Sequence, residues 1–361
     1  MLVQALLRNG GLAAVGRCVK TKRHPKYPHL IQFKYDQIES PMGDPVVQEC
    51  RGLILDENDN WNVVARPFDK FFNYGEGHAK PIDWTTARVQ EKLDGSLIIM
   101  YHYDEQWHVA TSGTPDAGGE VNGYGFTFAE LFQQTYTEMF ETLRRAGRPI
   151  FLGGLENFTF CFELTSKYNR IVVVHGEPKL TLIGIRHKDG TEYPLNSWLN
   201  AGFPTANEYP IQSMEAILAT FQTFQPTTQE GYVVVDANFN RVKVKHPGYV
   251  ALHHLKDGFG PRRMVEIVRQ GEISEVITHF PEYAAEFQVI QGKYNALVME
   301  IAADYEELRD IESQKTYALA AVERRCPGAL FALRAGQAVT AADYLRSIPE
   351  VRMLYLMGLK E

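Results

Sequence analysis

The stretch EKLDGSLIIM, residues 91–100, places Lys92, Asp94, Gly95 and Ser96 directly before a short apolar run. An apolar run that follows a turn signal is typical of a β-strand, so we expect Lys92 at the mouth of a strand. The K-x-D-G pattern fits either a surface lysine before a turn or a lysine nucleophile, since so short a pattern also arises by chance. The rest of the chain has to decide between the two.

Composition indicates a globular protein with room for two domains. The chain has 361 residues, of which 45% are hydrophobic, and it lacks an apolar run long enough to span a membrane. No C-x-x-C pair occurs, which favours a reduced, intracellular protein without structural zinc. The four scattered cysteines are Cys18, Cys50, Cys161 and Cys326.

The charge is unevenly distributed. A net charge of −7 does not suggest a nucleic-acid-binding protein, yet residues 1–35 contain no acid. Local basic patches, rather than total charge, govern binding to polyanions. An organelle transit peptide is a second explanation, ranked lower because the basic run continues into the strand-like LIQFKY. The basic residues of this segment are Arg8, Arg17, Lys20, Lys22, Arg23, Lys26 and Lys34.

Strand signals dominate from about residue 30 to residue 250. The short runs are rich in β-branched and aromatic residues and are bounded by Gly, Asp, Asn or Pro, which predicts an α+β domain with much antiparallel sheet. Helices are expected within 125–147, 195–202 and 213–224. The predicted strands are 30–35, 51–57, 62–68, 96–103, 107–112, 158–164, 170–176, 180–186, 231–237 and 241–246.

After residue 249 the pattern becomes helical. Apolar residues fall three or four apart between Phe287 and Leu308, the period of a buried helix face. Residues 313–325 and 341–358 also read as helices. Breakers in KDGFGP predict a boundary near 252–262, which gives domains at 1–254 and 255–361. The apolar set is Phe287, Ile290, Tyr294, Leu297, Ile301, Tyr305 and Leu308.

Five further polar stretches accompany KLDGS in the β-rich region. Taken singly, each has a simple structural explanation: a solvated strand-end carboxylate, an edge-strand lysine or a core phenylalanine. Together they offer a nucleophilic lysine, cations for a polyphosphate and carboxylates for a metal, the inventory of nucleotidyl transfer. The stretches are ECRGLILD (49–56), RPFDKFFNYGE (66–76), FELTSKYNRIVV (162–173), EGYVVVD (230–236) and RVKVKHPGYV (241–250).

This ordered set resembles the phage-type RNA ligase 1 family of covalent nucleotidyltransferases, over residues from about 33 to 255. The resemblance implies an ATP-grasp-like ligase adenylation domain with antiparallel sheets, followed by an all-helical C-terminal domain. It implies that Lys92 becomes adenylated and that cations hold the ATP phosphates. The nucleotide-binding residues it implies are Tyr35, Arg51, Lys70, Phe72, Gly95, Glu163, Glu230, Lys243 and Lys245, and Tyr249 matches a family aromatic.

Within that set the expected roles differ. Arg51, Lys70, Lys243 and Lys245 would contact phosphate, and the two strand lysines, two residues apart, share one face. Glu163 would contact the nucleoside sugar, Glu230 would lie in the metal region, and Gly95 would leave space beside the adenylate. The predicted ligands for Mg²⁺, with Mn²⁺ as an alternative, are Asp94, Glu163 and Glu230.

One position departs from the family pattern. Where the family usually has a lysine before Gly-Ser, this chain has Ser112 in ATSGTP. We expect the missing charge to come from elsewhere, from the basic N-terminal segment or from His108.

The implied reaction seals RNA that carries 5′-phosphate and 3′-hydroxyl ends, through lysyl-AMP and RNA-adenylate. Relatives repair tRNA, so cleaved tRNA is an expected substrate, in the cytoplasm of a bacterial or phage-infected cell; protein partners are not predicted. Two alternatives stay open. One is a capping-type nucleotidyltransferase, which normally carries a β-barrel after the final lysine motif. The other is a non-catalytic RNA-binding protein with a relic ligase fold.

Overall fold

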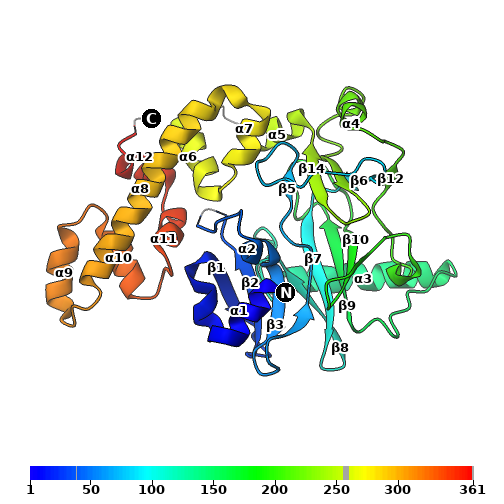
Figure 1. The fold of residues 1–361 in the computed structure, drawn as a ribbon, viewed down its shortest axis with the longest axis horizontal. Helices are drawn as coiled ribbons and strands as arrows, with labels where there is room; N and C mark the ends of the chain where they lie inside the picture. The colour runs from blue at the N-terminus through cyan, green and yellow to red at the C-terminus, as the bar shows by residue number, and fades with distance from the viewer. Residues whose placement is uncertain (38, 255–259, 360–361) are drawn as a thin grey trace. The chain divides into compact units, whose positions relative to one another are not determined.

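The computed structural model describes residues 1–37, 39–254 and 260–359. The chain forms two compact units, one of Met1–Asp36 with Ser40–Tyr249 and one of Gln37–Glu39 with Val250–Glu361. All named strands belong to the first unit, and the described elements of the second are helices (Figure 1). The predicted α+β class with antiparallel sheets and a helical C-terminal region is therefore confirmed. Residues 255–259 of the predicted linker lie outside the described residues, and the division after 254 stays a prediction.

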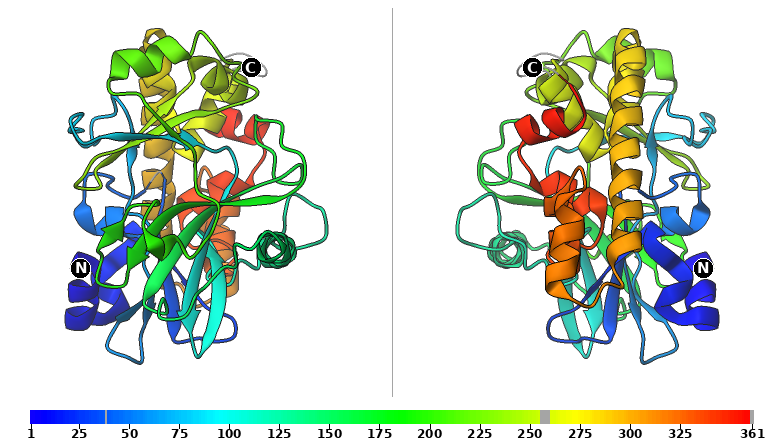
Figure 2. Two further views of the ribbon diagram at one scale, coloured as in Figure 1. Left: turned by 90° about the vertical axis from the view of Figure 1, so that its right-hand side faces the viewer. Right: turned by 90° about the vertical axis from the view of Figure 1, so that its left-hand side faces the viewer.

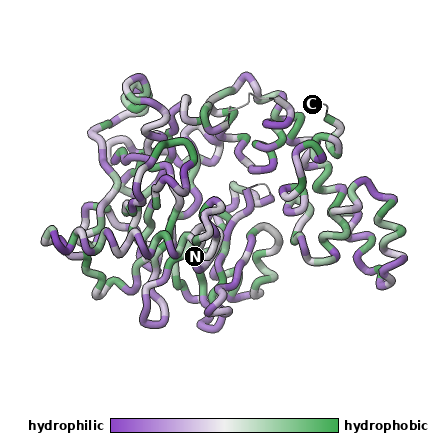
Figure 3. Tube along the Cα trace, turned by 180° about the vertical axis from the view of Figure 1, so that it is seen from behind, coloured by the Kyte–Doolittle hydropathy of each residue, from purple (hydrophilic) through white to green (hydrophobic). Residues whose placement is uncertain are grey.

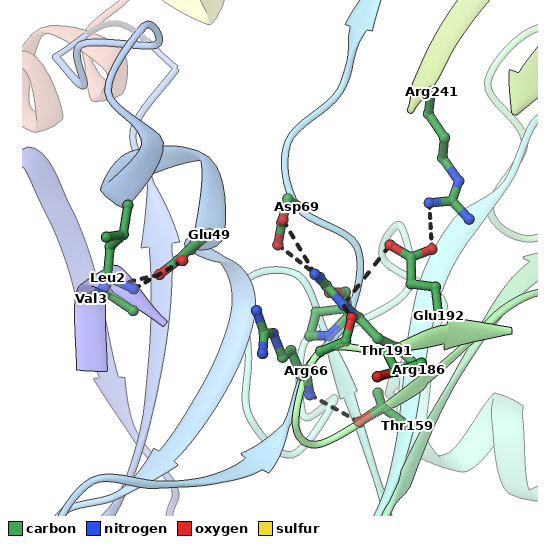
Figure 4. A network of polar contacts seen from close by, with 12 residues as sticks. Leu2, Val3, Glu49, Arg66, Asp69, Thr159, Arg186, Thr191, Glu192 and Arg241 are labelled. Carbon is green, nitrogen blue, oxygen red and sulfur yellow. Dashed lines mark hydrogen bonds and ion pairs between the residues drawn. The ribbon is translucent and has the colours of Figure 1, made fainter. Parts of the chain in front are cut away.

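The first sheet has the order β1-β2-β3-β4, and each neighbouring pair is antiparallel. Helices α1 (Leu2–Gly10) and α2 (Pro45–Glu49) bury apolar residues against it, together with Phe33 and Leu53. The Glu49 carboxylate accepts the first two backbone N–H groups of α1, at 3.0 and 2.9 Å (Figure 4). This contact satisfies donors that a helix start leaves without partners. The strands are Val19–Arg23, Leu30–Tyr35, Arg51–Asp56 and Asn62–Ala65.

The second sheet has the order β11-β10-β9-β7-β8 and is antiparallel throughout. Its β7 and β8 bury Ile99, Tyr101 and Ala110 against Leu30 and Ile54 of the first sheet. Helix α3 (Phe128–Arg145), which begins with a capping box at residues 127–130, runs beside this sheet (Figure 1). The strands are β7 Ser96–Tyr103, β8 Gln106–Thr111, β9 Phe158–Thr165, β10 Lys179–His187 and β11 Glu192–Tyr193.

The third sheet, ordered β12-β6-β13-β14-β5, carries the KLDGS lysine. Its pairs are antiparallel except for the parallel contact of β14 with β5. Helix α4 (Met214–Thr220) packs on its core through Met214 and Ile217. The strands are β5 Phe72–Asn73, β6 Arg88–Lys92, β12 Glu208–Tyr209, β13 Gly231–Val235 and β14 Arg241–Lys245.

The second unit is built around α8 (Ala284–Leu308), and six of the seven predicted face residues are buried there. Figure 2 shows α8 with the shorter helices α9 and α10 beside it, and Figure 3 shows green and purple residues alternating along these amphipathic helices. No helix within the described residues is both long and apolar enough to cross a membrane. The other helices are α5 Pro247–His254, α6 Pro261–Gln270, α7 Ile273–His279, α9 Gln314–Val322, α10 Pro327–Arg334, α11 Ala341–Ser347 and α12 Glu350–Leu356.

Three of the predicted elements differ in type or extent, and α1, α2, β1 and β6 were not predicted. Residues 170–176 form bends rather than a strand, because Val172 and Val173 donate their N–H groups to the Asp94 carboxylate. Residues 195–202 form only a 3₁₀ turn, Trp198–Asn200, since the chain turns to positive φ at Ala201 and Gly202. The helical pattern of 341–358 divides into α11 and α12 at the Ile348–Pro349 step, where Ile348 is extended before proline.

Candidate functional site

Lys92 is the last residue of strand β6 and lies in register with one residue on each of the strands β13 and β14. Lys92 pairs with Gly231 of β13, and Gly231 pairs in turn with Lys245 of β14. Gly231 has φ of +151°, and a Cβ there would lie 2.1 Å from the Val244 carbonyl oxygen. Only glycine allows this close approach, and it delivers the preceding residue, Glu230, between the two lysines.

Glu230 joins the two lysines through its carboxylate. Lys92 Nζ donates to Oε2 at 2.6 Å, and Lys245 Nζ lies 3.2 Å from Oε1. The Glu230 side chain is only 3% exposed, so the carboxylate depends on these cations in place of water. The predicted constellation of Lys92, Glu230 and Lys245 is thus one contiguous cluster.

Glu163 faces the same cluster from β9. Burial raises its pKa to about 7, the neighbouring Lys92 charge opposes this shift, and the Glu230 charge adds to it. The structure shows no hydrogen-bond donor to its carboxylate from the described residues. A carboxyl group that lines a cavity without a protein partner is available to a sugar hydroxyl or to a cation.

Lys92, Lys245 and Glu163 line a cavity of about 160 Å³ at the meeting of the second and third sheets, whereas Glu230 lies behind the two lysines and is not part of the lining. Of the predicted residues, the lining includes Arg51, Lys92, Glu163, Lys243 and Lys245. With Glu91 and Arg241, which also line it, the cavity combines a lysine amine, two half-buried carboxyls and four further cations, a composition suited to an anionic, polyhydroxylated ligand.

The other predicted cation, Lys70, lines a neighbouring cavity of about 350 Å³. Its amine lies 4.8 Å from the centre of the Tyr35 ring. Burial alone would raise the pKa of Tyr35, but the charges of Lys70 and Arg51 outweigh burial and lower it. Tyr35, the last residue of β2, is thus a buried neighbour of two cations.

The aromatic residues in the wall of the Lys92 cavity are Phe68 and Phe71, and the predicted Phe72 is not among them. Phe71 lines both cavities, with the Arg51 guanidinium 5.3 Å and the Lys243 amine 5.7 Å from its ring centre. Phe72 is 6% exposed and packs against His78, which favours a core role. The FF pair alone does not reveal which ring faces the ligand.

The carboxylate of Asp94 accepts hydrogen bonds from other groups of the protein. It accepts the N–H groups of Val172 and Val173 at 2.9 and 2.7 Å, and the Tyr249 hydroxyl at 2.8 Å. The side chain is 2% exposed. These contacts favour a positioning role for the turn that follows Lys92, in place of the predicted metal contact.

Gly95 is required for packing against β9. A Cβ there would lie 2.4 Å from the Leu164 carbonyl oxygen. The same carbonyl accepts a hydrogen bond from the Asn169 amide at 2.7 Å, and that amide also donates to Ser96 at 3.0 Å. The space expected beside an adenylate is therefore occupied by strand backbone, and the glycine serves to bring β7 and β9 together.

Arg241 is a cavity residue that the sequence analysis did not single out. It precedes Lys243 and Lys245 at the same two-residue spacing on β14, a signal that was present in RVKVK. Its guanidinium lies 2.5 Å from the Glu192 carboxylate, which also approaches Arg186 (Figure 4). The alternation of cations on one strand face thus includes three members.

The residues around Ser112 bear on which group supplies the charge of the missing lysine. His108 does not face it, because its ring bonds the Tyr103 carbonyl at 3.1 Å and stacks on Tyr101. The Ser112 Cα packs on Gly52, where a Cβ would lie 3.1 Å away. Gly52 adopts φ of +90° at a β-bulge, which explains the glycine of ECRG.

No three His, Cys, Asp or Glu side chains gather as a metal-binding group within the part of the chain that the structure describes. Mg²⁺ usually takes one or two carboxylates and keeps several waters. The Glu163 carboxyl, to which the described residues donate no hydrogen bond, fits such a site. Both oxygens of Glu230 are engaged by the two lysines, and both oxygens of Asp94 are engaged by hydrogen bonds, so these two carboxylates fit less well.

Comparison with known proteins identifies the family. Residues 49–249 match the model of a family described as RNA ligase. An RNA ligase of Rhodothermus phage RM378 is 27% identical, over 63% of this chain and 65% of the relative. A candidate bifunctional polynucleotide kinase/RNA ligase of Autographa californica nuclear polyhedrosis virus is 31% identical, over 77% of this chain and 42% of the relative. The chain thus spans less than two thirds of the length of these relatives.

Among solved structures, an archaeal ATP-dependent RNA ligase is similar at 13% identity and a TM-score of 0.46, covering 84% of this chain and 83% of that one. The family match covers more than half of the chain and contains Lys92, Glu163, Glu230, Lys243 and Lys245. The chain therefore belongs to the RNA ligase family, and the predicted resemblance to phage-type RNA ligases is confirmed.

Proposed function

We propose that the protein is an ATP-dependent RNA ligase that joins 5′-phosphate and 3′-hydroxyl ends of RNA. The observation that carries the proposal is the Lys92 amine, which opens on a cation-lined cavity and lies 2.6 Å from the Glu230 carboxylate. Membership of the RNA ligase family gives the reaction class.

Lys92 acts as the nucleophile in this proposal. Its amine must lose a proton before it attacks the α-phosphate of ATP, and Glu230 is placed to accept that proton. The new P–N bond forms as the P–O bond to pyrophosphate breaks. Arg51, Lys243 and Arg241 line the cavity and would neutralise the charge that collects on the leaving pyrophosphate.

Two transfers complete the reaction. An RNA 5′-phosphate oxygen attacks the lysyl-AMP phosphorus, the P–N bond breaks, and the proton returns to Lys92. A 3′-hydroxyl then attacks the activated 5′-phosphate and releases its proton to solvent as the new P–O bond forms, and AMP leaves with the electrons of the P–O bond that breaks. Mg²⁺ or Mn²⁺ bound near Glu163 and Glu230 would supply Lewis-acid neutralisation of phosphate oxygens.

The remaining parts of the proposal concern the two domains, the RNA substrate and the cellular location. The adenylation domain would comprise residues 1–254, and the helices of 255–361 would help to select RNA, with cleaved tRNA as one substrate. We place the activity in the cytoplasm of a bacterial or phage-infected cell, in keeping with the phage relative.

A sealing assay tests the proposal against its alternatives. The protein is incubated with ATP or GTP and with 5′-phosphorylated single-stranded RNA, nicked duplex or cleaved tRNA. We expect sealing with ATP, its loss in Lys92→Ala, and its retention in Lys179→Ala, whose lysine is exposed at the start of β10. Labelling by GTP alone would indicate a capping-type enzyme, and RNA binding without any nucleotide transfer would indicate a relic fold.

A further inference from the structure

Lys34 and Arg51 lie opposite each other on neighbouring antiparallel strands. Lys34 of β2 pairs with Arg51 of β3, next to the β-bulge at Gly52. Like charges directly opposite in an antiparallel pair repel each other and destabilise the sheet. This arrangement needs a compensating anion, and neighbouring protein groups are the first place to look for one.

Asp36 acts on Lys34, and Glu163 acts on Arg51, through charge alone. Among the described residues no carboxylate forms a hydrogen bond or an ion pair with either cation. Arg51 Nη1 is buried without a hydrogen-bond partner. For the Lys34 amine the described residues show neither an ion pair nor a hydrogen bond, and the nearby Asp36 carboxylate binds Lys20 at 3.0 Å. Burial lowers the pKa of Lys34 and outweighs Tyr35 and Asp36, which raise it. The charges of Lys20 and Arg51 add to the effect of burial. Holding both cations in these positions therefore costs free energy when no ligand is bound.

The amine of Lys34 lies against the turn that contains Ser112. A Cβ placed on Gly113 would be 3.2 Å from Lys34 Nζ. Thr111 Oγ1 accepts the N–H groups of Gly113 and Thr114, at 3.3 and 3.1 Å, which closes the turn. Gln32, two residues before Lys34 on the same face of β2, holds the turn through a 2.7 Å bond to the Thr111 carbonyl.

Other cations of the basic N-terminal segment are engaged elsewhere. Arg8 binds the Asn60 carbonyl at 2.9 Å, and Arg23 forms an ion pair with Glu57 at 2.7 Å. Lys26 lies 4.8 Å from the centre of the Tyr27 ring. Lys34 is thus the member of this segment that the structure places beside the Ser112 turn.

We propose that Lys34, Arg51 and the Thr111–Thr114 turn form a phosphate-binding subsite beside the Lys92 cavity. Lys34 supplies from β2 the positive charge that Ser112 cannot supply from the turn. The bound group is a phosphate, either of the ATP polyphosphate or of the RNA 5′ end, and this assignment rests on the proposed ligase function.

The test compares Lys34→Met, which removes the charge and keeps the chain length, with Lys22→Met. Lys22 is an exposed lysine of the neighbouring strand β1, so its variant has the same change in net charge. The rate of lysyl-AMP formation is measured against ATP concentration. The transfer of AMP from purified adenylated protein to 5′-phosphorylated RNA is measured separately.

We expect Lys34→Met to slow one of these steps about ten- to a hundredfold, with a smaller loss at high salt. A defect in lysyl-AMP formation identifies the ATP phosphates as the ligand, and a defect confined to transfer identifies the RNA phosphate. Ser112→Lys should restore much of the loss in the Lys34→Met background, and it should bring no gain alone because two cations would compete.

A stability measurement separates binding from a structural role. Because the Lys34–Arg51 repulsion is relieved, Lys34→Met should unfold at the same or a higher temperature than wild type without phosphate, while its activity falls. Equal rates of Lys34→Met and Lys22→Met in both steps would overturn the subsite. If wild type forms no lysyl-AMP, the ligase proposal fails, and calorimetric titration with pyrophosphate then decides the subsite: equal binding by wild type and Lys34→Met overturns it.

Discussion

Replacing Glu163 with glutamine should change how the stability of the protein depends on pH. The pKa of Glu163 is raised from 4.5 to about 7, chiefly because burial disfavours the carboxylate. A raised pKa means that the native state binds the proton more tightly than the unfolded state. Wild type therefore loses stability as pH rises from about 4.5 to about 7, and the loss is complete above that window.

The size of the effect follows from the two pKa values. Their difference corresponds to roughly 3 kcal/mol, and solvent screening of this half-buried side chain reduces it toward about 2 kcal/mol. Glutamine keeps the shape and cannot ionise. The unfolding free energy of Glu163→Gln relative to wild type should thus rise by about 2–3 kcal/mol between pH 4 and pH 8.

Urea unfolding of both proteins at pH 4, 5.5, 7 and 8 measures this difference, in which the titrating groups that do not interact with Glu163 cancel. The surface variant Glu156→Gln is the matched control, since the Glu156 carboxyl is exposed and its pKa is lowered by backbone hydrogen bonds. A difference between Glu163→Gln and wild type that stays constant over this range would refute the reasoning. It would show that Glu163 titrates as an ordinary carboxyl.

Three further changes test the site. Lys245→Ala should lower adenylation and cost about 1.5–3 kcal/mol of stability, more than a surface change, because buried Glu230 loses one of its two cations; urea unfolding and AMP labelling measure both. Gly95→Ala should cost about 1–3 kcal/mol by urea unfolding, because its methyl group would overlap the Leu164 carbonyl. A fragment of residues 1–254 should still adenylate itself and change its relative sealing of tRNA and single-stranded RNA.

Controls make these outcomes decisive. Gly77→Ala should leave stability unchanged, since a Cβ there meets no atom within 4 Å. Equal stability of Gly95→Ala and Gly77→Ala would contradict the predicted overlap at Gly95. Full AMP labelling of Lys245→Ala would contradict the predicted contact of Lys245 with phosphate. For the fragment, a cooperative unfolding transition shows that it is folded, and unchanged substrate preference would contradict a selective role of the C-terminal helices.

Spacing along the chain predicted part of the geometry around the cavity, whereas the roles of its residues were implied by the family resemblance and stay predictions. The two-residue spacing of Lys243 and Lys245 correctly predicted a shared strand face, and the same spacing extends to Arg241, which also lines the cavity. The glycine before the Tyr232 strand was visible in EGYVVVD. Its reason, a contact with the β14 backbone, is a matter of register that appears only when the strands are paired.

Other features depend on contacts between distant parts of the chain. Asp94 was predicted as a metal ligand, but its partners Val172 and Val173 lie about eighty positions away in a segment that reads as a strand by composition. Phe72 begins the two-residue strand β5 that pairs with β14, whereas Phe71 precedes that strand and lines the cavity. Local sequence patterns do not encode such long-range partners.

The central claim is that the Lys92 amine forms the covalent link to AMP. The most direct measurement is mass spectrometry of peptides after incubation of the full-length protein with ATP and Mg²⁺, without RNA. The account predicts one AMP on the peptide that contains Lys92, released when 5′-phosphorylated RNA is added, and none on Lys92→Ala. An adduct on another residue, or one that persists in Lys92→Ala, would contradict it.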